Sequence, residues 1–346
     1  MKLIEKVELR NFRNYGFARI ELHKGINSLV GRNGLGKTNF LEAVHLVCEE
    51  KALRAVKPEE LVKWGEEEGE VKGFFRDGNQ TFHRRILLRK KEVVVRRDAS
   101  ARSPRVVALL PDNISFVKGG PEDRRREMDS AISRLKAGYA RDLHDYARVV
   151  RHRNELLRGI RAGSESRETL AHWNSLLISL GRRIVEDRKS LLKEVKEIMG
   201  RILEELGRGD LEIRYYSSIR QANEGDVEGF LKRMEAAEIR RGQTLVGPHR
   251  DEVIFLLEGR SVRRECSQGE QKLVTLAWKL SIEEMMRSRG MKVILLLDDC
   301  LSELDDVHAE KVLQVLEGRE QVIITDAVRR QQLFKYRVVD LEKSLN

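Results

Sequence analysis

The eight residues from Gly31 to Thr38 have the spacing that proteins use to bind a nucleoside triphosphate. They match the pattern G-x-x-x-x-G-K-[ST], and we refer to them as the P-loop. An apolar run at residues 26–30 predicts a strand before them, and residues 39–44 begin a helical pattern. In such a unit, glycines let backbone N–H groups approach phosphate oxygens, and the helix N-terminus adds its dipole. The alternative is a glycine turn that only caps an ordinary helix.

Particular positions of the P-loop have particular expected roles. Lys37 is expected to reach the terminal phosphates, and the Thr38 hydroxyl is expected to be a ligand of Mg²⁺. The expected nucleotide contacts from this segment are Gly31, Gly34, Gly36, Lys37, Thr38 and Asn39.

Two carboxylates follow a fully apolar run at residues 293–297. Such a run predicts a strand buried on both faces, as in a parallel sheet that is covered by helices. Open α/β sheets bind ligands at the carboxyl ends of their strands, where Asp298 and Asp299 would lie. We therefore expect Asp298 to serve the magnesium ion and Asp299 to polarise the attacking water. The alternative is that the pair only caps a loop.

A second anion site is predicted at Ser267–Gln271, the signature segment, which precedes a helical pattern. Ser267, the Gly269 N–H group and the helix N-terminus could face a γ-phosphate, and Gln271 would belong to the same site. A purely structural interpretation fits equally well, because Ser267 and Glu270 have the spacing of a capping box.

The chain has 346 residues, a net charge of +10 and 35% charged residues. Clustered cations favour a polyanionic partner because phosphates reward them through counterion release, so we predict nucleic-acid binding. A well-solvated surface is the alternative. The expected DNA contacts are Arg84, Arg85, Arg89, Lys90, Arg151 and Arg153.

Several classes of protein are disfavoured by the composition. No apolar stretch approaches the roughly 20 residues that a membrane span needs. Glu5 and Glu8 interrupt the N-terminal apolar pattern, which argues against a signal peptide. The three cysteines lie far apart, so a zinc site or a disulfide framework is not expected and a reducing cytoplasm fits.

The pattern of elements predicts an α/β protein with a helical insertion. Alternating residues predict antiparallel strands over residues 69–98, and residues 121–207 have helical periodicity that is broken at 159–166. An antiparallel helical arm is the favoured interpretation, and an ordinary packed helical domain is the alternative. The predicted domains are residues 1–120 and 243–346 for the two parts of a head, and 121–242 for the insertion.

Together these segments resemble the ABC-type ATPase heads of the structural-maintenance-of-chromosomes (SMC) group. The matching segments are Gly31–Thr38, Ser267–Gln271, Leu295–Asp299 and Ser302–Asp305, with an insertion after the first. This resemblance implies a mixed sheet with a parallel core and an antiparallel β subdomain. It also implies that the signature segment of one head completes the ATP site of another, giving a head-to-tail dimer that closes over ATP and Mg²⁺. In related heads the residues corresponding to Arg13 and Asn33 approach the phosphates, and Asp305 lies in the D-loop.

A closer resemblance, spread over the whole chain, is to the RecF family of bacterial recombination mediators. It rests on Leu9–Tyr15, Pro111–Arg125, Gly247–Asp251 and Asp298–Asp305. The resemblance implies a cytoplasmic, nucleoid-associated protein that binds duplex or gapped DNA when ATP closes the dimer. It also implies RecR as a partner, RecO and RecA as indirect partners, and a role in loading RecA at single-strand gaps. Another SMC-like DNA-repair ATPase is the alternative.

Two departures from transporter heads bear on the chemistry. Transporter heads place a His after the strand that follows their paired carboxylates, whereas this chain has Thr325-Asp326-Ala327. Transporters also have Glu where this chain has Asp299. We therefore expect slow hydrolysis and do not expect a membrane-transporter subunit. An SMC-like ATPase coupled to a nuclease is disfavoured by the lack of a nuclease carboxylate set, and a nucleotide-regulated scaffold without DNA is the remaining alternative.

Overall fold

The computed structural model describes residues 2–54, 56–89, 92–97, 103–221, 227–326 and 330–341. The chain forms two compact units. The first consists of Met1–Asn113, Glu205–Gly207 and Leu276–Asn346, and the second consists of Ile114–Glu204 and Arg208–Thr275. Among the described residues, no helix combines the length and the apolar character that crossing a bilayer requires.

A parallel sheet in the first unit carries the segments with the predicted chemistry. Its order is β13-β3-β12-β11-β7, and every neighbouring pair is parallel. Every residue of β11 and β12 is buried, as predicted for strands that are covered on both faces. Parallel strands end at one common edge, so the residues that follow β3 and β11 meet there. The strands are β3 (Gly25–Val30), β7 (Arg105–Leu109), β11 (Val293–Asp298), β12 (Gln321–Asp326) and β13 (Arg337–Asp340).

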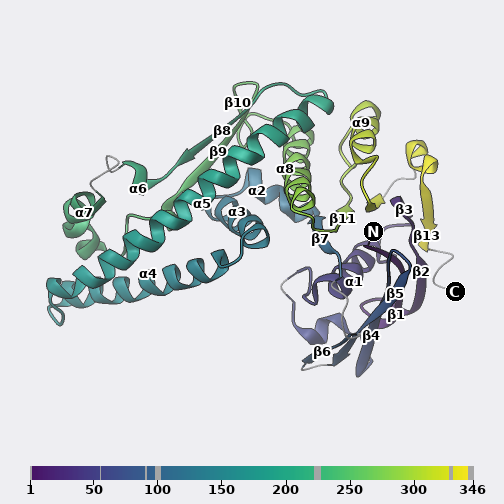
Figure 1. The fold of residues 1–346 in the computed structure, drawn as a ribbon, viewed down its shortest axis with the longest axis horizontal. Helices are drawn as coiled ribbons and strands as arrows, with labels where there is room; N and C mark the ends of the chain where they lie inside the picture. The colour runs from purple at the N-terminus through teal and green to yellow at the C-terminus, as the bar shows by residue number, and fades with distance from the viewer. Residues whose placement is uncertain are drawn as a thin grey trace. The chain divides into compact units, whose positions relative to one another are not determined.

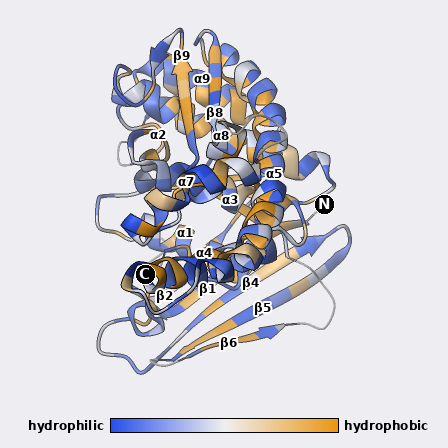
Figure 2. Cartoon of the chain, turned by 90° about the vertical axis from the view of Figure 1, so that its left-hand side faces the viewer, coloured by the Kyte–Doolittle hydropathy of each residue, from blue (hydrophilic) through white to orange (hydrophobic). Residues whose placement is uncertain are grey.

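An antiparallel sheet in the same unit has the order β2-β1-β4-β5-β6. Buried and more exposed residues alternate along β4 and β5, and Figure 2 shows the matching alternation of hydropathy. Antiparallel strands over residues 69–98 were predicted, and the structure confirms them. The strands are β1 (Lys2–Phe12), β2 (Tyr15–Glu21), β4 (Glu68–Asp77), β5 (Gln80–Arg89) and β6 (Glu92–Arg97).

Helix α1 (Lys37–Glu49) joins the two sheets into one core. Residues 40–48 of this helix are buried, and they pack in a hydrophobic cluster with side chains from strands of both sheets. The N-terminus of α1 is thereby fixed beside the end of β3. The other helical segments of this unit are η1 (Pro58–Leu61), η2 (Pro111–Ile114), α9 (Asp306–Leu316), η5 (Gln331–Lys335) and residues 276–288 of α8 (Gln268–Ser288).

The second unit is built on two long helices, α4 (Tyr139–Ala162) and α5 (Leu170–Glu205), which lie side by side in Figure 1. Asp142 pairs with Arg183, and Arg153 donates to the Asn174 side chain, so the helices are antiparallel as predicted. The turn is shorter than expected, because α4 continues to Ala162 and ends at Gly163, whose φ of 78° is left-handed.

Shorter elements complete this unit. A three-stranded antiparallel sheet has the order β10-β9-β8. The elements are α2 (Ser115–Lys118), α3 (Pro121–Leu135), η3 (Arg167–Thr169), β8 (Leu211–Tyr216), α6 (Ser218–Gln221), α7 (Val227–Arg241), η4 (Pro248–Arg250), β9 (Glu252–Leu257) and β10 (Arg260–Ser261). By packing, residues 243–275 belong to this unit rather than with residues 276–346. The division at residues 120/121 and 242/243 stays a prediction.

Candidate nucleotide site

The P-loop turns at two glycines with left-handed backbone. Gly34 has φ of 85° and Gly36 has φ of 100°, a region in which side chains are strained. A Cβ at Gly36 would also lie 2.5 Å from the Asn14 Oδ1 atom, so this position needs glycine for both reasons. With this conformation, the backbone of the P-loop leads directly into the first turn of α1.

The N-terminus of α1 is suited to an anion. No side chain caps it, and its first turn contains no acidic residue. By contrast, Glu122 and Asp123 lie in the first turn of α3, and Asp306 lies in that of α9. The first N–H groups of any helix lack partners within the helix, and the helix dipole makes that end positive. At α1 nothing acidic competes with a phosphate for these groups.

Lys37 provides a positive charge at the same place. Its ammonium group donates to the Gly31 carbonyl at 2.6 Å and to the Arg32 carbonyl at 3.1 Å. The charge therefore lies over the loop that would surround the phosphates. Gly31, Asn33, Gly34, Gly36 and Asn39 all lie in this loop or in the first turn of α1, and their contacts to a nucleotide stay a prediction.

Thr38 and Asp298 meet although 260 positions separate them in the sequence. The Thr38 hydroxyl donates to the Asp298 Oδ2 atom at 2.7 Å. A hydroxyl and a carboxylate are hard oxygen ligands, which suit Mg²⁺. The described residues contain no group of three or more His, Cys, Asp or Glu that could hold a metal ion. The pair therefore fits an ion that is completed by phosphate oxygens and waters rather than by a protein cage.

The buried side chain of Thr325 contacts both Asp298 and Asp299. Its hydroxyl donates to the Asp298 Oδ1 atom at 2.7 Å and accepts from the Asp299 N–H group at 3.0 Å. Strand pairing explains the contact, because Thr325 lies opposite Asp298 in the β11–β12 register. The prediction did not include Thr325. Its signal in the sequence was a hydroxyl residue at the end of the next apolar strand.

Asp299 has an unusual backbone and a carboxylate oxygen without a partner. Its φ is 50°, which is left-handed and uncommon outside glycine. Its Oδ1 atom is buried and has no hydrogen-bond partner among the described residues. Buried polar atoms normally have partners, so a carboxylate oxygen without one singles out Asp299 as a candidate functional residue. The backbone strain is the cost of placing it there.

A second set of contacts, which the sequence analysis also missed, holds the P-loop from the β1–β2 turn. Asn14 donates to the Leu35 carbonyl at 3.0 Å and accepts from the Asn39 side chain at 2.8 Å. The Tyr15 hydroxyl donates to the Gly36 carbonyl at 2.8 Å. Burial raises the pKa of Tyr15 far above its usual value, so the hydroxyl remains a donor. The turn therefore positions the loop without itself offering a charge.

Arg13 belongs to the same turn but is paired with protein groups. Its guanidinium donates to both carboxylate oxygens of Glu42, at 2.8 and 3.0 Å, and to the Glu60 carbonyl at 2.6 Å. A nucleotide contact by Arg13 would require part of this arrangement to open, and it stays a prediction.

The signature segment, in the second unit, begins α8 with a capping box. The Ser267 N–H donates to Glu270 at 2.7 Å, and the Glu270 N–H donates to the Ser267 hydroxyl at 3.3 Å. A hydrogen bond from Arg260 lowers the pKa of Glu270 to about 2, so this carboxylate is ionised. Gln271 is buried and donates to the Val262 carbonyl at 2.9 Å, which fixes the turn that precedes α8. The capping interpretation is thus fulfilled, and the phosphate role of Ser267, Gly269 and Gln271 stays a prediction.

Asp305 caps the following helix of the first unit. Its carboxylate accepts from the His308 N–H at 2.8 Å and so begins α9. It also lines an open pocket of about 550 Å³ beside Arg330. The position is accessible to a partner group, and its predicted role at the nucleotide stays open.

Comparison with known proteins agrees with this geometry. The RecF/RecN/SMC N terminal domain family model matches residues 3–340. The DNA replication and repair protein RecF of Desulforudis audaxviator is 33% identical over 342 residues, covering 94% of each chain. The RecF of Bacillus cereus (strain G9842) is 31% identical, covering 93% of this chain and 91% of its own. The chain belongs to the RecF family.

Solved structures support the same assignment. A structure of the recombination mediator protein RecF-ATPrS in the RecFOR pathway has a TM-score of 0.77 and 28% identity, and the match covers 98% of each chain. An Smc head domain from Pyrococcus furiosus shares the fold, with a TM-score of 0.54 and 18% identity over 97% of this chain and 92% of its own. The resemblance drawn from the motifs is therefore confirmed, as is the ABC-type head fold with its helical insertion.

The predicted DNA contacts of this RecF-family chain divide into exposed and buried residues. Arg84 is 5% exposed and donates to the Val47 and Cys48 carbonyls at the end of α1. Arg153 is 0% exposed and bonds to Glu238, Asn174 and Thr244. Their burial corrects the prediction for these two, because neither side chain is accessible to a DNA phosphate.

The other predicted contacts are at the surface or outside the description. Arg85 pairs with Glu70, and Arg89 pairs with Glu68 and Glu92, each with about half of its side chain exposed. Arg151 is exposed, and Lys90 lies outside the described residues. These four stay predictions.

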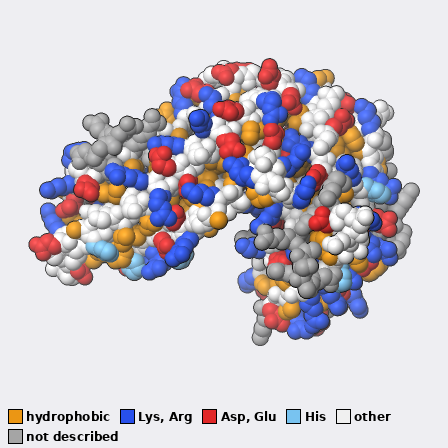
Figure 3. Space-filling model, viewed as in Figure 1, with side chains coloured by type: hydrophobic (Ala, Val, Ile, Leu, Met, Phe, Trp, Pro, Cys, Tyr) orange, Lys and Arg blue, Asp and Glu red, His pale blue; other side chains and the backbone are white. Residues whose placement is uncertain are grey.

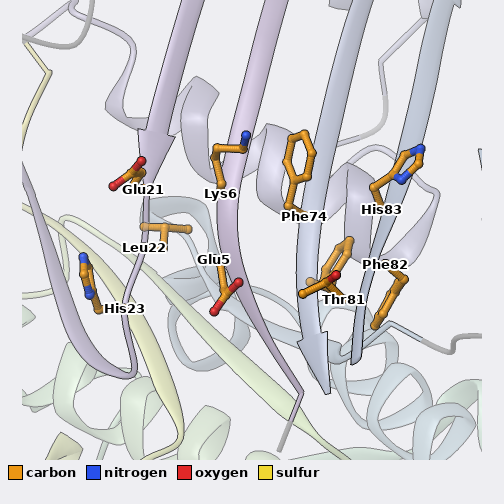
Figure 4. Close-up of a pocket in the computed structure, with 10 residues that line it drawn as sticks. Glu5, Lys6, Glu21, Leu22, His23, Phe74, Thr81, Phe82 and His83 are labelled. Atoms are coloured by element: carbon orange, nitrogen blue, oxygen red, sulfur yellow. The ribbon is translucent and has the colours of Figure 1, made fainter. Parts of the chain in front are cut away.

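A cavity of about 530 Å³ on the antiparallel sheet is separate from the P-loop of this RecF-family chain (Figure 4). Lys6 lies 3.7 Å above the Phe74 ring, and Glu5 and Glu21 add negative charge to the lining. Two carboxylates next to a single lysine do not favour phosphate, so the cavity is no rival to the P-loop as a nucleotide site.

A Thr325→Val variant is expected to hydrolyse ATP about tenfold to a hundredfold more slowly, with little change in ATP binding. Valine keeps the shape but leaves the Asp298 Oδ1 atom and the Asp299 N–H group without their partner. The split between kcat and KM in a steady-state ATPase assay checks this. Thr325→Ser should recover most of the rate, and a Val variant with wild-type kcat would remove the positioning role.

Proposed function

We propose that this protein is a DNA-binding ATPase of recombinational repair, whose ATP-bound form is a head-to-tail dimer. The hydrogen bond between Thr38 and Asp298 carries the proposal, because it joins the P-loop to the carboxylate pair in one site. Membership of the RecF family supports it, as do ATP-bound structures of a related RecF. Slow hydrolysis then opens the dimer and releases DNA.

The residues divide the work at the ATP site. The N-terminus of α1 and Lys37 bind the phosphates. Thr38 and Asp298 would hold Mg²⁺, which supplies charge neutralisation of the phosphates when bound. Asp299 orients the attacking water and accepts its proton at the side-chain carboxylate.

Completion of the site from a second copy is the next step of the proposal. Ser267, Gly269 and Gln271 of one protomer would face the γ-phosphate that is bound by its partner, and Asp305 would lie at the same junction. Each ATP then lies between two chains and favours their association to the extent that it binds the dimer more tightly than the monomer.

Four residues are the remaining proposed contacts to DNA phosphates: Arg85, Arg89, Lys90 and Arg151. Such contacts do not depend on base sequence. The proposed setting is the bacterial cytoplasm, on the nucleoid, at duplex or gapped DNA. There the protein would help to load RecA at single-strand gaps together with RecR, and indirectly with RecO.

Size measurement with and without nucleotide tests the proposal. The protein, alone and with gapped duplex, is passed over a sizing column with light scattering in ATP, in ADP and without nucleotide. A dimer with ATP only, and its association with the DNA, are expected. A monomer under all conditions would contradict the dimer, and an ATP-dependent dimer that never binds gapped duplex would favour a scaffold without DNA.

The rate of hydrolysis tests the timing role. Turnover is expected below the ordinary enzyme median of about 10 s⁻¹, because the Asp299 carboxylate reaches one methylene less far than a glutamate would. A faster steady-state rate would contradict a timer.

A further inference from the structure

An open pocket of about 320 Å³ lies in the second unit, between α4 and residues 242–250. Arg151, Asn154 and Arg158 line it from α4, and their spacing of three, four and seven positions places them on one face of the helix. Arg250, from η4, lines the opposite side. We call this opening the arginine pocket.

The arginine pocket has positive charge without compensation. None of its lining residues is a carboxylate. Within the described ranges, Arg151 and Arg158 form no ion pair, whereas Arg141 and Arg148 on the same helix each lie within 4.0 Å of Asp145. Three guanidinium groups at one opening repel one another unless an anion lies between them.

Hydrogen bonds hold the loop that forms one wall of the arginine pocket. The Asn154 Oδ1 atom accepts from the Thr244 N–H at 2.6 Å and from its hydroxyl at 2.8 Å. His249 bonds to the Thr244 carbonyl and to the Tyr146 hydroxyl. Burial lowers the pKa of His249 to about 4, and nearby arginine charges act in the same direction. The imidazole is therefore a neutral spacer that fixes the loop.

The stem of Arg158 depends on a glycine. Gly242 has φ of 63°, and a Cβ there would lie 2.7 Å from the Arg158 Cγ atom. The Oδ1 atom of Asn154 is already used, which leaves its amide N–H groups without a partner in the described part of the chain. The pocket thus offers guanidinium and amide donors and no charged acceptor.

We propose that the arginine pocket binds a phosphate group of a nucleic-acid backbone. Guanidinium groups match phosphate oxygens in a bidentate geometry, which favours phosphate over a simple halide. The pocket has no Phe, Tyr or Trp in its lining, so no wall is available for stacking a base, as a nucleotide site or a base-reading site would need. The assignment rests on the proposed DNA binding and adds Arg158, Arg250 and Asn154 to the contact surface.

Two charge-matched double variants test the assignment. One is Arg151→Gln with Arg158→Gln, in the pocket. The other is Arg141→Gln with Arg148→Gln, which removes the same charge from exposed positions on the same helix. Binding of a fluorescent gapped duplex is followed by anisotropy between about 50 and 200 mM salt. The pocket variant is expected to lose about 0.9 of the slope of log K against log salt, the value for one phosphate contact, while the control keeps the wild-type slope.

The possible results of this experiment distinguish a failure of the arginine-pocket assignment from a failure of the proposed function. If the wild-type protein does not bind gapped duplex, the proposed function fails first. If it binds and the two double variants have equal slopes, the arginine pocket is overturned. ATP-dependent dimerisation should survive in both variants. Inorganic phosphate that binds to the wild type but not to the pocket variant at constant ionic strength, while the two double variants have equal slopes for DNA, would assign the pocket to free phosphate instead.

Discussion

An Asp299→Asn variant is expected to bind ATP and to dimerise like the wild type, but to hydrolyse ATP about 10²–10⁴-fold more slowly. The amide keeps the size of the side chain and leaves the backbone hydrogen bond to Thr325 in place. It cannot accept a proton in the way that a carboxylate does. The Oδ1 atom has no hydrogen-bond partner among the described residues, so the amide breaks no contact at that atom.

The effect of Asp299→Asn on DNA release tests the proposal more sharply than its effect on hydrolysis. Because opening is proposed to follow hydrolysis, Asp299→Asn should accumulate as an ATP-bound dimer on gapped duplex and should dissociate far more slowly than the wild type. Single-turnover hydrolysis and dissociation after dilution into competitor DNA measure both steps. Asp210→Asn, at an exposed position, is the matched control. Wild-type dissociation with blocked hydrolysis would separate release from chemistry and contradict the timer.

The parts of the site that the sequence analysis predicted are those encoded by neighbouring residues. The P-loop is one continuous segment, and the carboxylate pair directly follows an apolar strand. Parallel strands that end at one edge then bring Thr38 to Asp298. Thr325 and Asn14 were missed because their contacts depend on strand register and on the path of a turn, which no local pattern reports.

The two misassigned arginines show a different failure. Arg84 was predicted as a DNA contact from the charge of a cluster, yet it lies on the same face of β5 as Ile86 and Leu88, which are buried. Arg153 likewise shares a helix face with Val149 and Leu157. Periodicity of two in the strand and of three to four in the helix therefore contained the correction. The prediction relied on the number of arginines in each cluster, whereas the face of the strand or helix on which each arginine lies determines whether its side chain is exposed.

Two further variants, Lys37→Met and Ser267→Arg, are each expected to abolish ATP-dependent dimerisation and hydrolysis, for different reasons. Lys37→Met removes the charge that lies at the Gly31 carbonyl beside the N-terminus of α1, and so weakens ATP binding. Ser267→Arg leaves the P-loop intact but places a large cation at the N-terminus of α8, where the proposed γ-phosphate contact would form. It should therefore bind ATP as a monomer, which a filter-binding assay can show.

Mixing the two inactive proteins distinguishes an ATP site that is shared between two chains from one that is built within a single chain. In a mixed dimer, the P-loop of the Ser267→Arg chain meets the signature segment of the Lys37→Met chain, so one of the two sites is intact. Because neither variant is expected to dimerise with itself, every dimer that forms can be mixed, and the activity should recover to at most about half of wild type. A site built within one chain would recover nothing on mixing. In a shared site, the cation of Ser267→Arg would block closure of the dimer. A Ser267→Arg protein that still dimerises with ATP would therefore also exclude the shared site.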